Sequence, residues 1–228
     1  MKHKFEICGM QILLAAATQF EMSPLLEKHP SADFLVTGVG APQAIYQFTR
    51  RLQQMDYDLV IQAGIAGSFD HALALGDVVL VAEDCFADIG ILEGGQFYTV
   101  FEKGLAAADE LPFREGWLKN DHPLLRQQEY KKVKGITVNT VTDDQRQIEL
   151  LRAKFKPEIE TMEGAALHYV CVAQQVPFIQ VRSISNYIGE RDKSKWKMKE
   201  AIENLGKALE GILHDISTNG QDPATSRI

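Results

Sequence analysis

Two glutamates occupy positions from which a carboxylate could do chemistry. Glu163 lies in the run Glu-Thr-Met-Glu-Gly-Ala-Ala over residues 160–166, and Glu21 follows a short apolar run near the start of the chain. A carboxylate offers two acceptor oxygens, so it can hold two hydroxyl groups of a ligand or take a proton from water. Both glutamates also have a structural interpretation, because an acid is favoured in the first turn of a helix and Glu21 can cap the segment that starts at Ser23. Neither residue alone therefore defines a site.

The alternation of predicted strands and helices gives the framework that would position these side chains. Short apolar runs rich in β-branched residues predict buried strands at residues 10–16, 34–37, 59–62, 77–81, 135–138 and 177–184. Helical periodicity predicts helices at residues 41–55, 143–155, 162–175 and 195–216. This order is typical of an α/β sandwich around a largely parallel or mixed sheet, in which ligands bind where the strands end.

Length and composition predict one globular domain over residues 1–216. The chain has 228 residues, of which 45% are hydrophobic and 24% are charged, as in ordinary folded domains. Residues 217–228 have no apolar periodicity and predict a disordered tail. Residues 97–132 are polar and carry two prolines, which predicts a long excursion near the mouth of a site or at a subunit contact.

The formal charge of −7 argues against a nucleic-acid surface, which needs clustered Lys and Arg, and favours a small ligand. No apolar run is long enough to cross a bilayer. Cys8, Cys85 and Cys171 show no CxxC spacing, and we expect reduced, buried thiols in a cytoplasmic protein. The six histidines lack the spacing of a metal site, so we expect neither a metal nor a cofactor.

Two glycine turns follow predicted strands. Gly38 and Gly40 precede a helix, a setting in which backbone amides can bind an anion, but the third glycine and the distant acid of a dinucleotide site are missing. The second turn contains Gly64 and Gly67, whose missing side chains let the backbone approach a ligand or a neighbouring element. By themselves, both turns are equally well explained as tight connections within the sheet.

Taken together, four motifs resemble the purine nucleoside phosphorylase and nucleosidase superfamily. They are Gly64-x-Ala66-Gly67, Gly76-Asp77-Val78-Val79, Glu160-x-Met162-Glu163 and Arg182-x-Ile184-Ser185-Asn186. Within the superfamily the chain is most similar to the methylthioadenosine/adenosylhomocysteine nucleosidases and the futalosine hydrolases. The resemblance implies a single three-layer α/β/α domain with a twisted mixed central sheet, and a homodimer.

The resemblance assigns roles to individual residues. Glu21 corresponds to the acid that activates the attacking water, and Met162 and Glu163 correspond to the pair that holds the ribose. Asn186 falls where the adenine-specific nucleosidases carry an Asp that protonates the leaving base. An amide cannot give that proton, but its donor and acceptor complement a 6-oxopurine such as hypoxanthine. A loop Asn that caps the next turn is the structural alternative.

Further substrate contacts are expected at Ile65 and Gly67 in the second glycine turn, at Ser185 beside Asn186, and at Phe86, which could stack on a purine. Ile65 replaces the hydroxyl side chain that is usual in relatives. An apolar residue there and a negative Glu21 both disfavour a bound phosphate. Water is therefore the expected nucleophile.

The favoured function is hydrolysis of futalosine to hypoxanthine and dehypoxanthine futalosine, a step of menaquinone biosynthesis. Three alternatives stay open: a methylthioadenosine/adenosylhomocysteine nucleosidase, a purine nucleoside phosphorylase, and a non-catalytic nucleoside-binding module. Neither the group at C5′ of the ribose nor the acceptance of an amino-purine can be inferred from these residues.

Overall fold

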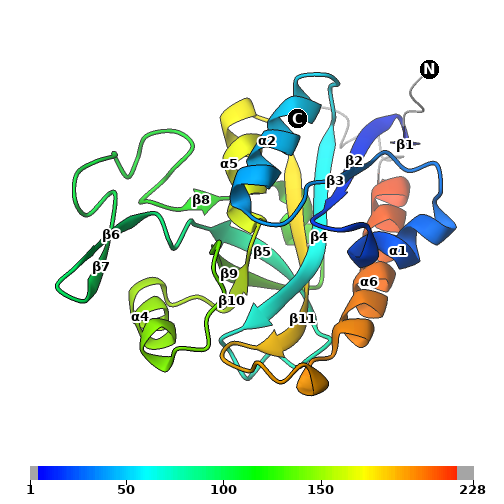
Figure 1. Cartoon of the computed structure of the whole chain (residues 1–228). Helices are drawn as coiled ribbons and strands as arrows, with labels where there is room; N and C mark the ends of the chain where they lie inside the picture. The colour runs from blue at the N-terminus through cyan, green and yellow to red at the C-terminus, as the bar shows by residue number, and fades with distance from the viewer. Residues whose placement is uncertain (1–4, 220–228) are drawn as a thin grey trace.

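The computed structural model describes residues 5–219. Its strands and helices follow one another along the chain as β1 (Glu6–Ile7), β2 (Met10–Ala16), α1 (Gln19–Lys28), β3 (Phe34–Val36), α2 (Ala41–Leu52), β4 (Leu59–Ser68), β5 (Val78–Asp84), β6 (Gly90–Glu93), β7 (Gln96–Thr99), β8 (Leu118–Lys119), α3 (Pro123–Gln127), β9 (Lys131–Thr137), α4 (Gln145–Phe155), β10 (Ile159–Thr161), α5 (Gly164–Gln174), β11 (Phe178–Tyr187), a 3₁₀ turn (Lys193–Lys195) and α6 (Met198–Asn219). Figure 1 shows this chain path from the N-terminal blue to the C-terminal red.

The long strand β4 organises the sheet because it changes partner along its length. Its first half runs parallel to β2, where Leu59 lies opposite Ile12. Its last residues run antiparallel to β10, where Gly67 lies opposite Glu160. On its other side β4 runs parallel to β11 along the whole strand. The last half of β4 therefore reaches an edge that β2 does not cover.

The pairings beyond β4 bring the sheet back on itself. β11 pairs with β5, β5 with β9, β9 with β10 and β10 with β4, so these five strands form a ring. Both parallel and antiparallel pairs occur, which confirms the expected mixed central sheet. The closed ring was not anticipated, because it depends on pairings between strands far apart in the sequence.

Helices cover the sheet on two sides (Figure 1). α2 and α5 pack on one side, around Phe48, Val60 and Leu167. α1 and α6 pack on the other side, around Leu25 and Leu209. This arrangement confirms the layered α/β fold.

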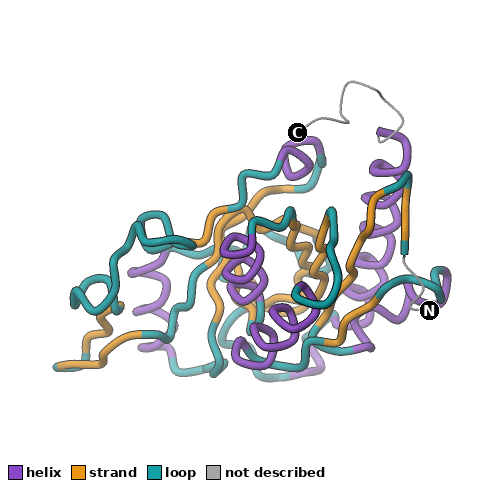
Figure 2. Tube along the Cα trace, turned by 90° about the horizontal axis from the view of Figure 1, so that it is seen from above, coloured by secondary structure: helices purple, strands orange, loops and turns teal. Residues whose placement is uncertain are grey.

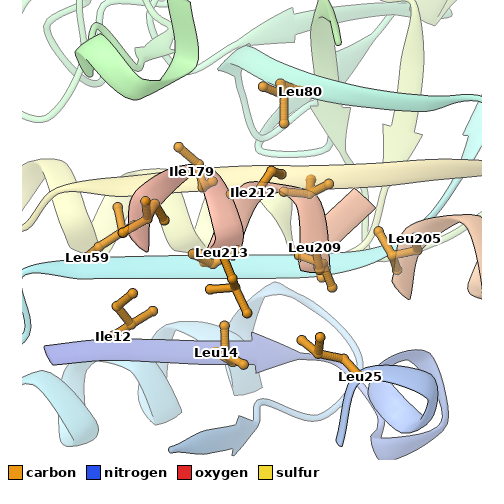
Figure 3. Close-up of a cluster of buried hydrophobic side chains, with 14 of the residues drawn as sticks. Ile12, Leu14, Leu25, Leu59, Leu80, Ile179, Leu205, Leu209, Ile212 and Leu213 are labelled. Atoms are coloured by element: carbon orange, nitrogen blue, oxygen red, sulfur yellow. The ribbon is translucent and has the colours of Figure 1, made fainter. Parts of the chain in front are cut away.

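The largest apolar cluster lies between α6 and the strands β2, β4 and β11 (Figure 3). α6 contributes side chains at spacings of three and four residues, namely Leu205, Leu209, Ile212 and Leu213. This spacing puts them on one face of the helix, which explains why residues 195–216 were readable as a helix from the sequence. Burial of this face anchors the C-terminal helix to the sheet.

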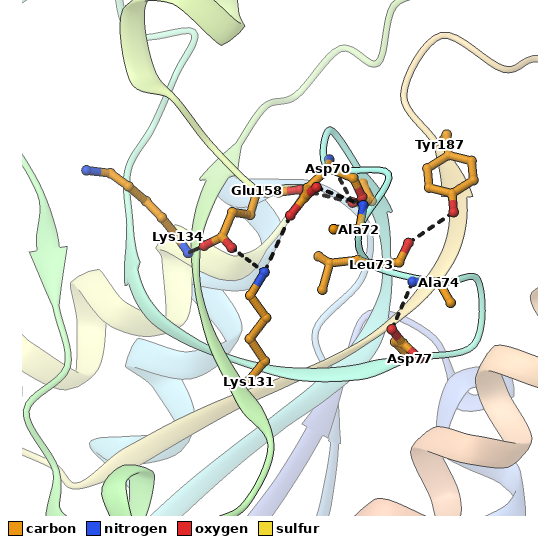
Figure 4. A network of polar contacts seen from close by, with 10 residues as sticks. Asp70, Ala72, Leu73, Ala74, Asp77, Lys131, Lys134, Glu158 and Tyr187 are labelled. Atoms are coloured by element: carbon orange, nitrogen blue, oxygen red, sulfur yellow. Dashed lines mark hydrogen bonds and ion pairs between the residues drawn. The ribbon is translucent and has the colours of Figure 1, made fainter.

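A network of polar contacts fixes the loop between β4 and β5 (Figure 4). The Nζ atom of Lys131 lies 2.8 Å from a Glu158 carboxylate oxygen and 3.4 Å from an Asp70 carboxylate oxygen. The hydroxyl of Tyr187 donates to the backbone carbonyl of Leu73 at 3.0 Å. The contact from Tyr187 ties the loop to the end of β11, next to Asn186.

The polar segment over residues 97–132 contains more structure than expected. It includes the end of the β6–β7 hairpin, β8 and the short helix α3. The hairpin and the loop after it project from the body in both Figure 1 and Figure 2. An ion pair between Lys154 and Glu102 at 2.7 Å and the packing of Phe97 on Phe155 hold this arm against α4.

Three smaller expectations need correction or restriction. Helix α6 continues to Asn219, so the tail predicted from residue 217 begins at least three residues too early, and residues 220–228 lie outside the described part. Cys8 is exposed, unlike the buried Cys85 and Cys171. Within residues 5–219, no helix is both long and apolar enough to cross a membrane.

We predict that Leu209→Ala lowers the free energy of unfolding by about 2–5 kcal/mol, because it leaves a cavity in a fully buried cluster. Urea denaturation measures the change. Lys207→Ala, on the exposed side of the same helix, is the control and should stay within about 0.5 kcal/mol of wild type. Equal destabilisation by both variants would contradict the packing described for α6.

Candidate active site

A cavity of about 460 Å³ lies where β2, β4, β10 and β11 end. Most of the residues predicted from the sequence line it, namely Glu21, Ile65, Gly67, Met162, Glu163, Ser185 and Asn186. They come from four separate parts of the chain. The fold therefore brings the predicted residues together, with Phe86 as the exception.

Glu21 is held by backbone amides from two elements. One carboxylate oxygen accepts a hydrogen bond from the amide of Ile65 at 3.2 Å, and the other accepts from the amide and hydroxyl of Thr18, each at 3.0 Å. The residue is only 8% exposed. It lies in the first turn of α1, a helix that is absent from the helices predicted from the sequence. The sequence pattern does not predict this helix, because it is short and contains Pro24.

Glu163 immediately precedes helix α5 and is buried. One of its carboxylate oxygens accepts a hydrogen bond from the amide of Gly40 at 2.9 Å. Burial raises the pKa of Glu163, whereas the charge of Arg182 and the Gly40 amide lower it, and the charge of Glu21 raises it again. The two predicted carboxylates therefore lie close enough to influence each other.

Arg182 is a buried cation behind these carboxylates, with 1% of its surface exposed. Its Nη2 donates to the side-chain carbonyl of Gln62 at 3.1 Å. A Cβ atom on Gly64 would lie 2.3 Å from Arg182 Nη1 and 2.8 Å from Glu21 Oε1, distances that no real side chain tolerates. Gly64 is thus required for space, because the arginine and Glu21 approach the strand at this point.

Asn186 lies in β11 and not in a loop. The register between β11 and β4 shifts between Ile184 and Asn186, a bulge that redirects the side chains after it. The Ser185 hydroxyl lies 2.8 Å from Asn186 Oδ1, and Asn186 Nδ2 donates to the Tyr187 carbonyl at 3.2 Å. These contacts orient the amide at the edge of the cavity and, among residues 5–219, leave it one N–H and one lone pair without a partner.

Phe86 does not line this cavity, so its predicted contact with the substrate is not supported. Its ring packs against Tyr169, with ring centres 6.1 Å apart. It lines a second cavity, of about 250 Å³, together with Trp117 and Phe155. The physical reason is that β5 ends at Asp84, after which Phe86 bridges to Thr137 and turns away from the other site residues.

Comparison with known proteins agrees with this geometry. The sequence pattern of the phosphorylase superfamily matches residues 34–214. This chain belongs to the phosphorylase superfamily. A futalosine hydrolase of Thermus thermophilus is 29% identical, over 88% of this chain and 94% of its own length. A futalosine hydrolase of Streptomyces coelicolor is 30% identical, over 78% of this chain and 76% of its own length.

Solved structures of the superfamily share the fold. A 5′-methylthioadenosine/S-adenosylhomocysteine nucleosidase of Colwellia psychrerythraea, determined in complex with adenine, superposes with a TM-score of 0.75. The likeness covers 92% of this chain and 96% of that one, at 20% sequence identity. At 20% identity this comparison supports the fold alone, and the substrate has to be inferred from the residues of the site.

The cavity lining also contains Glu160, to which the sequence analysis assigned no role in the site. It lines the cavity, is 5% exposed, and its Oε2 has no hydrogen-bond partner within the described residues. Burial raises the pKa of Glu160 to about 7, and the negative charge of Asp88 adds to the rise. The sequence signal that could have revealed it is its place in the motif Glu160-x-Met162-Glu163.

We predict that the free energy of unfolding falls as the pH rises, because the buried Glu160 carboxyl group then loses its proton. Its pKa of about 7 lies above the ordinary value of 4.5, so between these values only the unfolded chain loses the proton. The stability present below pH 4.5 is therefore lost as the pH rises through 7, by on the order of 3 kcal/mol. Urea denaturation at pH 5 and pH 8 should show a smaller loss in Glu160→Gln than in wild type.

The control for this measurement is Glu149→Gln, which removes an exposed carboxylate from α4 and should keep the pH dependence of wild type. An unchanged loss of stability in Glu160→Gln would contradict the burial of an unpaired carboxyl group.

Proposed function

We propose that this protein hydrolyses the N-glycosidic bond of futalosine and releases hypoxanthine and dehypoxanthine futalosine, a step of menaquinone biosynthesis by the futalosine route. The observation that carries the proposal is the meeting of Glu21, Glu163 and Asn186 in one cavity. The futalosine hydrolases among its relatives support this substrate. By resemblance we also propose a cytoplasmic homodimer.

The reaction breaks the bond between C1′ of the ribose and the purine, while water supplies a hydroxyl group to C1′ and a proton to the base. Positive charge develops on the sugar as this bond lengthens. Glu163 receives the ribose hydroxyls and stabilises that charge from below the ring, with Met162 packing beside it. Glu21 takes a proton from the attacking water. The two backbone contacts that fix Glu21 hold it ready for this role without a later rearrangement.

The glycine turns favour water over phosphate as the nucleophile. The Gly40 amide is used by Glu163, and the Ile65 amide is used by Glu21. A phosphate would have to compete with a carboxylate for each of these donors. The cavity lining also contains more acids than bases, with Arg191 as its one basic residue against Glu21, Glu160, Glu163 and Glu190. These charges repel a phosphate.

Asn186 favours hypoxanthine as the leaving base. The N–H of the amide can donate to O6 or N7 of a 6-oxopurine, both of which are acceptors, whereas position 6 of adenine carries an amino group, which is a donor. The amide cannot supply a proton as a carboxylic acid does. The second candidate is a methylthioadenosine/adenosylhomocysteine nucleosidase, which is supported by the 30% identity to the 5′-methylthioadenosine/S-adenosylhomocysteine nucleosidase of a Marinomonas species over 78% of this chain.

We predict that the purified protein releases hypoxanthine from futalosine without phosphate. The comparison substrates are inosine, methylthioadenosine and adenosylhomocysteine, and chromatography of the free bases identifies the product. Futalosine should be the one substrate of the four that is turned over efficiently. Faster release of adenine from methylthioadenosine would overturn the assignment of the base, and dependence on phosphate would overturn hydrolysis.

We predict that Glu21→Gln and Glu163→Gln each lower kcat for futalosine by at least about a hundredfold, because each removes a charge that acts on the reacting groups. Both substitutions keep the side-chain volume. Glu27→Gln, on the exposed side of the same helix as Glu21, is the control and should keep wild-type turnover. Activity within tenfold of wild type in either variant would remove that glutamate from the mechanism.

A further inference from the structure

The start of helix α5 is not capped by the residue that usually caps a helix. The side chain just before the first turn of a helix normally accepts a hydrogen bond from the second or third amide of that helix. Glu163 occupies this position in α5, and its side chain makes no such bond. Its carboxylate accepts from the Gly40 amide instead and lines the cavity. The first amides of α5 therefore need other acceptors.

Two threonine hydroxyls supply these acceptors. The Gly164 amide donates to Thr161 Oγ1 at 3.0 Å, and the Ala165 amide donates to Thr137 Oγ1 at 2.7 Å. Thr161 ends β10 and Thr137 ends β9, and the two residues lie opposite each other in the parallel pair that these strands form. Both threonines are buried. The pairing of two strands thus brings both hydroxyls under the first turn of α5.

Asp84 fixes the direction of the hydrogen bonds in this cluster. Its Oδ1 accepts from the Thr137 hydroxyl at 3.0 Å and from the Cys85 amide at 2.8 Å. A hydroxyl has one hydrogen, so Thr137 cannot donate to Thr161 as well. The Thr161 hydroxyl, whose oxygen lies 3.2 Å from that of Thr137, is therefore the donor of the two. Both hydroxyl oxygens keep a lone pair for a helix amide.

The first residue of α5 lies directly against this cluster. A Cβ atom on Gly164 would lie 2.3 Å from Asp84 Oδ2 and 2.8 Å from Thr161 Oγ1. Glycine is required here because the helix begins so close to the two side chains. Glu163 immediately precedes Gly164, so the cluster also sets where the backbone of Glu163 lies.

We propose that Thr137 and Thr161, aligned by Asp84, are positioning residues for the reaction: they cap α5 in place of Glu163 and so leave the Glu163 carboxylate free to face the ribose. This inference rests on the proposed function, in which Glu163 holds the ribose hydroxyls. Without the hydroxyl of Thr137, the Ala165 amide takes its acceptor from the capping position, and the Glu163 side chain turns away from the cavity.

Steady-state kinetics with futalosine tests the proposal in two variants. Thr137→Val keeps the shape of the side chain and removes the hydroxyl, whereas Thr137→Ser keeps the hydroxyl. Thr137→Val should lower kcat per folded protein by about tenfold or more, because a catalytic group displaced by about 1 Å loses much of its effect. Thr137→Ser should stay within about threefold of wild type, because the acceptor and the donor are both retained.

A double-substituted protein shows whether Thr137 acts through Glu163. In a Glu163→Gln background, Thr137→Val should change kcat by less than about threefold, because the group that it positions is already lost. Leu209→Ala is the control for lost stability, since its side chain lies in the core between α6 and the sheet, and it should keep the wild-type kcat per folded protein. Circular dichroism gives the folded fraction of each variant.

Crystal structures of the variants provide a readout that does not depend on turnover. The Glu163 carboxylate should keep its contact with the Gly40 amide in Thr137→Ser and exchange it for the Ala165 amide in Thr137→Val. If Thr137→Val does not fold, Thr161→Val and Thr161→Ser repeat the test at the second hydroxyl.

The outcomes separate this inference from the proposed function. If wild-type protein hydrolyses futalosine and Thr137→Val keeps its kcat, or loses as much in the Glu163→Gln background as in wild type, the positioning role is overturned and the proposed function stands. If wild-type protein does not hydrolyse futalosine, the proposed function fails. The crystal structures then decide the positioning role, which a Glu163 carboxylate still bound to Gly40 in Thr137→Val would overturn and a displaced one would support.

Discussion

The guanidinium of Arg182 is the charge on which the site depends. Glu163 lies buried at the cavity, and Asp84 lies fully buried on another strand of the same sheet. Burial raises the pKa of both carboxyl groups, and the charge of Arg182 opposes the rise in each case. A carboxylate can stay charged inside a protein when a cation or a set of amide donors offsets its lost hydration. The strand beside Arg182 then has to carry glycine at position 64, because any side chain there would displace the guanidinium or Glu21.

The same constraint explains how backbone amides are used. In many α/β proteins a glycine turn before a helix binds a phosphate of the ligand. Here the turn at Gly40 binds the protein's own Glu163, and the amide of Ile65 binds Glu21. Each carboxylate receives a donor from a segment far away in the sequence, so the pairing of β2, β4 and β10 is needed to bring donor and acceptor together. The preference for water thus follows from the fold as well as from the identity of the side chains.

The sequence predicted what depends on local pattern. Apolar periodicity predicted strands at β2 and β11 and helices at α2 and α6. Motifs of neighbouring residues indicated Glu163 and Asn186. The place of Glu160 in the cavity, the closed ring of strands and the position of Phe86 were not predicted. Each of these depends on which strand pairs with which, and a three-residue strand such as β10 has too few residues to show an alternating pattern. The helix at Glu21 was not predicted because it is short and because Pro24 lies inside it, where proline removes a backbone hydrogen bond and so argues against a helix.

The two ends of the cavity differ in how their residues are held. Glu21 and Glu163 are fixed by backbone amides. The sheet sets the positions of these amides, together with Gly64, where a Cβ atom would collide with Arg182 and Glu21, and Gly40, whose positive φ disfavours a side chain. Asn186 and Glu160 are held by their own strands and by small neighbours such as Ser185 and Gly67. A substitution at the second pair changes which donors and acceptors face the ligand, while the carboxylates of the first pair keep their contacts. Under the proposed function, such a fold could change the base that it recognises without rebuilding the carboxylates proposed to act on the sugar and water.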